Sequence, residues 1–231
     1  MKRLRRILFA LITTSAFAAG AQSAVAGPPG YNPANGTNWA GFYVGIQGGY
    51  AWGETQYSVP GFSTPQTDMN GGAFGVTWGT NWQSGKWVYG TESDFSFTDI
   101  DGGTSSGCTP HCFTDIRNLS TSRLRAGYAV DGNKLLYVTG GLAYGSVRAG
   151  IDGTALQDEK TRFGWTLGGG MEWALAPHWS LKAEYLHVDL GDHHNFEEPR
   201  PVHVDVTADV VRVGLNYNLG PNFWRDILGM R

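Results

Sequence analysis

The sequence lacks any long apolar run beyond its first residues, and it contains only two cysteines. A transmembrane helix needs about 18 or more consecutive apolar residues, and no stretch after residue 26 approaches that length. The chain is therefore not a helical membrane protein. It also has no nucleophile and base arrangement, and no basic surface with interleaved aromatic residues. We expect neither an enzyme nor a nucleic-acid-binding protein.

The first 26 residues have the three parts of a secretory signal peptide. A basic M-K-R-L-R-R start is followed by an apolar run over residues 7–19 and by the small residues A-V-A at 24–26. Such a run is too short to cross a membrane as a helix. We predict a cleaved signal peptide over residues 1–26, an exported protein, and a flexible leader over residues 27–38.

Residues 39–53 read W-A-G-F-Y-V-G-I-Q-G-G-Y-A-W-G and alternate between two faces. The even positions are mostly aromatic or aliphatic, whereas the odd positions are mostly small or polar. Alternation of this kind indicates a β-strand, because successive side chains leave the pleat on opposite faces. At about 3.3 Å per residue and a tilt of about 45°, ten or eleven residues cross the hydrocarbon core. This stretch is predicted to be a membrane-crossing strand.

Seven further stretches repeat the alternation, at residues 72–83, 87–97, 119–129, 134–147, 162–174, 180–188 and 209–219. Their connections alternate between short turns and long segments, and the long ones are residues 54–70, 98–118, 148–161 and 189–207. Short periplasmic turns and long outer loops are typical of outer-membrane barrels. We predict an all-β protein, an eight-stranded antiparallel transmembrane β-barrel over residues 39–219, with a short periplasmic extension over residues 220–231.

A soluble eight-stranded barrel of the lipocalin kind has the same alternation with its faces reversed. That barrel would expose the face rich in glycine, arginine and glutamate, and it would enclose the aromatic residues in a small lumen. The chain carries 34 glycines, which recur on one face of the strands, and aromatic residues gather at the strand ends. Aromatic girdles of this kind mark the two membrane interfaces, so the membrane barrel is favoured.

Several motifs together carry a resemblance to a known family. They are residues 39–53, Y-V-T-G-G-L-A-Y-G at 137–145, W-T-L-G-G-G-M-E-W-A-L at 165–175, W-S-L-K-A-E-Y-L at 179–186 and V-R-V-G-L-N-Y at 211–217. The chain resembles the small outer-membrane β-barrel family of alphaproteobacteria, which is similar to OmpA-type barrels. That family includes porin-like surface antigens and hemin-binding members. The resemblance implies an outer-membrane location and contact with the barrel assembly machinery during biogenesis, but no single activity.

One departure from the family concerns the end of the last strand. Such barrels commonly end on an aromatic residue that the assembly machinery reads. Here the matching position is Leu219, and the chain continues to Arg231. Pro221 ends the strand, so Phe223, Trp224 and Ile227 are expected at or below the periplasmic interface.

The inward face of the predicted barrel carries four acids and four bases: Glu92, Asp94, Glu172, Glu184, Arg123, Arg125, Lys182 and Arg212. An eight-stranded barrel is just wide enough for its own side chains, and buried charges are tolerated when they are paired. We interpret the eight residues as lumen ion pairs that fill the barrel. A gated ion path is the alternative. A catalytic carboxylate pair is disfavoured, because neighbouring cations keep the acids ionised.

Two groups of residues in the long segments could bind or cross-link. Cys108 and Cys112 frame the sequence C-T-P-H-C, and two cysteines in an exported chain favour a disulfide over a metal site. His193, His194 and His203 lie in the last long segment. A solvated loop is favoured there, and a heme or metal site is the alternative that the hemin-binding relatives suggest. We expect no catalytic residues, no resident metal and no cofactor.

The predicted function follows from these features. We expect an integral outer-membrane barrel, surrounded by outer-membrane lipid, with a structural or surface-interaction role and a lumen filled by paired charges. Its long loops would be available to an extracellular partner or to heme. A narrow or gated porin is the alternative, and a surface heme-binding or adhesin protein is the third reading.

Overall fold

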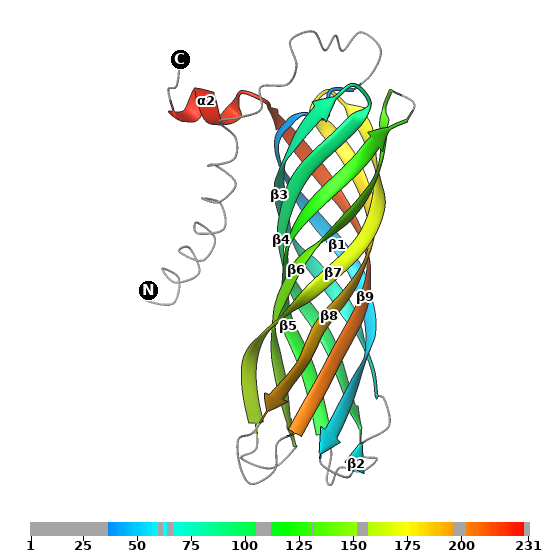
Figure 1. Cartoon of the computed structure of the whole chain (residues 1–231), viewed down its shortest axis with the longest axis vertical. Coiled ribbons are helices and arrows are strands. Elements are labelled where there is room, and N and C mark those ends of the chain that lie inside the picture. Colours follow the sequence, from blue (N-terminus) through cyan, green and yellow to red (C-terminus); the bar gives the residue numbers. More distant parts are fainter. Residues whose placement is uncertain are drawn as a thin grey trace.

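The computed structural model describes residues 37–59, 62–63, 67–104, 112–130, 132–151, 157–195 and 202–228, and these form a closed antiparallel barrel (Figure 1). The long strands are β1 (Gly41–Val59), β3 (Thr67–Ser84), β4 (Trp87–Thr104), β5 (Cys112–Ala129), β6 (Lys134–Ile151), β7 (Gln157–Ala176), β8 (Trp179–Asn195) and β9 (Val202–Gly220). Each pairs with the next long strand, and β9 pairs with β1. The predicted eight-stranded barrel is confirmed.

Two short elements accompany the long strands. The two-residue strand β2 (Phe62–Ser63) pairs with the end of β1, and the helix α2 (Phe223–Leu228) follows β9. Among the described residues, no helix is long and apolar enough to cross a membrane. The predicted signal peptide and nearly all of the predicted leader lie outside the described residues, so both stay predictions.

The alternation of the sequence becomes the inside and the outside of the barrel. On β5, Leu124 points outward and is 69% exposed, whereas its neighbours Arg123 and Arg125 are 3% and 4% exposed. Aromatic pairs bound the outward apolar band. Trp87 lies 5.2 Å from Tyr128, centroid to centroid, at the end with the short turns, and Tyr144 lies 6.1 Å from Phe163 further along.

The strands are longer than a membrane crossing requires. They contain 17 to 20 residues each, whereas about ten or eleven tilted residues suffice to span the hydrocarbon core. The extra length lies at the end opposite the short turns. There the ends of the eight strands extend beyond the level of Tyr144 and Phe163, and we call this part of the barrel the collar. The expectation of long connections at residues 54–70, 98–118, 148–161 and 189–207 is therefore wrong in its extents, because most of these residues belong to paired strands.

The collar has the reversed alternation of a soluble barrel. Outward positions such as Glu54, Asp68 and Asp99 are exposed, whereas the inward residues Met69 and Ile100 are each 1% exposed. Beyond the membrane the outer face meets water, so apolar side chains stabilise the fold only if they point inward. A search for apolar residues on the outer face misses these strands for that reason.

A β-bulge in β5 joins the membrane part to the collar. The register shifts between Ile116 and Asn118, and Arg117 between them is exposed. The extra residue exchanges the inward positions from even to odd: Ile116 is buried on one side of the bulge and Leu119 on the other. Bulges of this kind insert one residue and bend the strand locally.

Adjacent glycines in β3 provide a test of the close strand packing. A Cβ at Gly71 would overlap the backbone of Asp99 on β4, whereas a Cβ at Gly72 would meet no atom within 4 Å. We expect Gly71→Val to lower the unfolding free energy by about 1–3 kcal/mol through overpacking, and Gly72→Val to leave it nearly unchanged. Denaturant unfolding in lipid vesicles, followed by tryptophan fluorescence, measures both. Equal losses in the two variants would contradict this account.

Candidate functional site

The candidate site is the lumen, and its periplasmic layer is built around Trp39. This side chain is 4% exposed and packs with Val88, Ala129, Leu135 and Tyr137. The backbone N–H of Trp39 donates to Gln83 Oε1 at 2.8 Å, and the N–H of Thr37 donates to the carbonyl of Gly132 at 2.5 Å.

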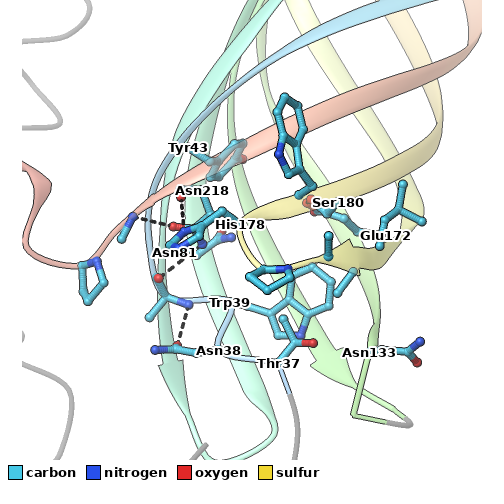
Figure 2. A pocket seen from close by; sticks show the side chains of 18 of the residues that line it. Thr37, Asn38, Trp39, Tyr43, Asn81, Asn133, Glu172, His178, Ser180 and Asn218 are labelled. Atoms are coloured by element: carbon cyan, nitrogen blue, oxygen red, sulfur yellow. Dashed lines mark hydrogen bonds between the residues drawn. The ribbon is translucent and has the colours of Figure 1, made fainter.

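The segment before β1 therefore lies across the periplasmic mouth (Figure 2). A cavity of about 580 Å³ remains beside Trp39, and residues lining it include Asn81, Glu172, His178 and Ser180. This cavity lies between the Trp39 layer and the turn from β7 to β8.

The central layer brings together all eight charged residues that the sequence places in the lumen. None is more than 5% exposed, and the set is Glu92, Asp94, Arg123, Arg125, Glu172, Lys182, Glu184 and Arg212. Glu92 lies directly opposite Arg123 in the pairing of β4 with β5. Adjacent strands therefore bring one acid and one base together, as the order of the strands requires.

The carboxylate of Glu92 accepts hydrogen bonds from three basic side chains. Arg123 Nη2 lies 2.5 Å from Oε1, Lys182 Nζ lies 2.9 Å from the same oxygen, and Arg125 Nη1 lies 3.3 Å from Oε2. Lys182 reaches Glu92 from β8, across the lumen. The pairing therefore joins strands that are not neighbours in the sheet.

The remaining acids are held in the same way. Arg212 Nη2 lies 2.6 Å from Glu184 Oε2 and 2.9 Å from Asp94 Oδ2. Arg123 also contacts both acids, at 3.0 Å to Glu184 and 3.1 Å to Asp94. One guanidinium thus joins three carboxylates from two strands on opposite sides of the barrel.

Glu172 on β7 completes the layer near the periplasmic cavity. Arg125 Nη2 donates to Oε2 at 2.9 Å, and Ser180 Oγ and Asn216 Nδ2 donate to Oε1 at 2.5 Å and 3.0 Å. Buried charges require this degree of hydrogen bonding, because a charge without partners in a low-dielectric interior costs several kcal/mol.

Two tyrosines in this layer were not among the predicted site residues. The hydroxyl of Tyr43 donates to Glu92 at 2.7 Å and accepts from Arg125 at 3.0 Å. The hydroxyl of Tyr137 donates to Glu184 at 2.9 Å, and the Arg125 guanidinium lies 4.0 Å from the Tyr137 ring centroid. The one sequence feature that could have found them is the alternation of the strands, because both tyrosines occupy positions that point into the lumen.

The outer layer is apolar and lies within the outer half of the barrel. Its members are 6% exposed or less: Ala51, Met69, Ile100, Ile116, Leu119, Ala143, Val147, Leu186, Val188, Leu190, Val206 and Val210. Several of them come from the segments expected to be loops. From its periplasmic to its outer end the lumen thus contains an apolar layer with the cavity beside it, a charged layer and a second apolar layer.

The structure places the predicted histidines in strands instead of a loop. His194 pairs with His203, and His193 pairs with Val204, between β8 and β9. The paired strands thus extend through these three positions, so the expectation of a loop there is wrong. Among the described residues, no group of His, Cys, Asp and Glu side chains could hold a metal ion. A heme or metal role for the three histidines stays a prediction.

Comparison with known proteins places the chain in a family. The sequence model of the family described as "outer membrane protein beta-barrel domain" matches residues 9–218 of this chain. The chain belongs to this family. The predicted outer-membrane location is confirmed by the relatives of this barrel protein, which are named as outer-membrane proteins.

Two curated relatives show how far the likeness extends. The 31 kDa outer-membrane immunogenic protein of Brucella melitensis is 36% identical, over 90% of this chain and 95% of the relative. The 22 kDa outer membrane protein of Rhizobium leguminosarum is 34% identical over 66% of this chain and 64% of the relative. The predicted resemblance to alphaproteobacterial surface antigens is thereby confirmed.

A solved structure shares the fold. The outer membrane protease OmpT of Escherichia coli matches with a TM-score of 0.51, 10% identity, 86% of this chain and 100% of that chain covered. At this identity the likeness shows the barrel fold alone.

Removing Arg123 should destabilise the barrel strongly. Arg123→Ala takes one buried partner from each of Glu92, Asp94 and Glu184, and breaking a buried ion pair costs about 3–5 kcal/mol. Arg117→Ala is the matched control, since Arg117 is an exposed arginine on the same strand. Its effect should stay within about 0.5 kcal/mol. The midpoint of the heat-induced mobility shift on a gel reports both, and equal midpoints for the two variants would refute the role of the network.

The predicted disulfide can be tested directly. Cys108 lies outside the described residues, and Cys112 begins β5, so the bond between them stays a prediction. Thiol labelling of the intact protein without reductant should find neither cysteine free, and labelling after reduction should find both. Quantitative labelling before reduction would exclude the bond.

Proposed function

We propose that this barrel is a closed structural and surface-interaction protein of the outer membrane and does not act as a porin. The observation that supports this is the burial of the lumen. The apolar and charged residues of its three layers are at most 8% exposed, from Ala129 near the periplasmic mouth to Val206 in the collar. A lumen open to water would expose the side chains that line it.

The three layers oppose ion passage for different reasons. Each of the eight charges in the central layer is already paired with groups of opposite sign. None of them is therefore available to bind a passing ion. The outer layer offers only apolar side chains, and moving an ion into such surroundings costs several kcal/mol. A narrow or gated porin would require rearrangement of all three layers.

The collar supports the surface role. Its outer face carries exposed charged residues, including Glu54, Asp68, Asp99, Asp101 and Arg117. The continuous strand pairing holds these groups on a rigid wall above the outer aromatic pairs. The named immunogenic relatives are consistent with surface display. We propose that an extracellular partner binds this collar.

Conductance distinguishes the closed barrel from a porin. In planar bilayers the wild-type protein should show only small or rare openings. Trp39→Ala should behave like the wild type, because the charged and outer apolar layers still lie in series with the opened periplasmic layer. Arg123→Ala should open more often, because it loosens the layer that ties opposite walls together.

The control for these recordings is Lys86→Ala, at an exposed turn outside the lumen, which should match the wild type. A large and steady wild-type conductance that Arg123→Ala leaves unchanged would show that the lumen is open. That outcome would favour the porin.

A further inference from the structure

The chain turns away from the barrel directly after the last strand. Gly220 has a φ of +87°, which favours glycine, and Pro221 cannot donate to a strand ladder. Asn222 then precedes α2, and asparagine is a favourable residue at this capping position. Figure 1 shows α2 at the end with the short turns, beside the barrel wall. The helix therefore lies at the level of the periplasmic interface.

The first residue of α2 contacts the lipid-facing wall of the barrel. The ring of Phe223 stacks on Phe42, with 5.0 Å between centroids and 10° between planes. Phe42 belongs to the outward face of β1 and lines an apolar groove with Val44, Trp179 and Tyr217. Trp179 and Tyr217 form one of the periplasmic aromatic pairs, 4.9 Å apart. The helix thus continues the lipid-facing band at its periplasmic edge.

The far end of α2 carries apolar side chains that no described part of the barrel covers. Ile227 is 60% exposed and Leu228 is 59% exposed. In the sequence F-W-R-D-I-L, apolar residues occupy the first, second, fifth and sixth positions, which share one side of a helix. Helical periodicity predicts the charged positions of this sequence, 225 and 226, for the other side. A helix of six residues is not stable by itself in water, so an apolar surface must support it.

We propose that α2 is an interfacial anchor that lies in the headgroup and acyl boundary of the periplasmic leaflet. Its partner is the lipid surface, because the helix begins on the aromatic edge of a wall that already faces lipid. Amphipathic helices of low overall hydrophobicity bind membranes in this position, with the apolar side inserted. The segment that departs from the common barrel ending thus extends the contact of the barrel with lipid.

A depth measurement tests the anchor. A Cys108→Ser, Cys112→Ser background would carry one new cysteine, either Ile227→Cys or Asp226→Cys, labelled with the fluorophore NBD. Each would be placed in phosphatidylcholine nanodiscs that hold one barrel, so that no second copy is present and both faces are accessible. The background is retained only if its heat-induced mobility shift matches the wild type.

The label at position 227 should emit at shorter wavelength, and brominated lipid should quench it at least twofold more than the label at 226. Aqueous iodide should quench the two labels in the opposite order. Phe42→Ala should reduce the lipid quenching at 227, whereas Phe74→Ala, which removes another lipid-facing phenylalanine, should not. Equal iodide quenching at both positions, or a 227 label that bromine does not reach, would overturn the anchor. An unchanged signal in Phe42→Ala would overturn the role of the stacked rings.

Discussion

The narrowness of an eight-stranded lumen is the constraint on which the rest of this structure depends. Such a barrel holds side chains but no wide channel, so every inward residue meets residues from the opposite wall. Charged side chains can occupy that space only in mutual contact. Arg123 meets this condition through Glu92, Asp94 and Glu184, which come from β4 and β8.

The same constraint explains why the layers differ along the axis. Lys182 on β8 reaches Glu92 on β4 across the lumen, and Arg123 on β5 reaches Glu184 on β8, so the central layer joins opposite walls by specific contacts. Above it, residues such as Leu186 and Val188 fill the space by packing alone. The charged layer joins opposite walls by ion pairs, whereas the apolar layer stabilises the collar where no lipid surrounds it.

Both ends of the barrel face water, and each differs in structure from the part inside the membrane. At the outer end the strands continue and reverse their faces, so the protein presents a rigid charged wall. At the periplasmic end the chain before β1 covers the mouth with Trp39, and the chain after β9 leaves sideways at Gly220. The relatives of this chain share the barrel family, and the surfaces beyond the membrane are where members of one fold can differ in role.

The sequence by itself determined the membrane strands and the side of each strand that faces lipid, because period-two alternation is a local property of the pleat. It also placed all eight lumen charges. Tertiary structure alone decided that Lys182 reaches Glu92 and that Tyr43 joins the network, since these contacts depend on how the closed sheet staggers opposite strands. It also decided the extent of the collar. The apolar side of each strand changes from the outer to the inner face where lipid gives way to water. A bulge at Arg117 also changes which alternate positions of β5 point inward. A sequence pattern defined by lipid contact therefore ends before the strands do.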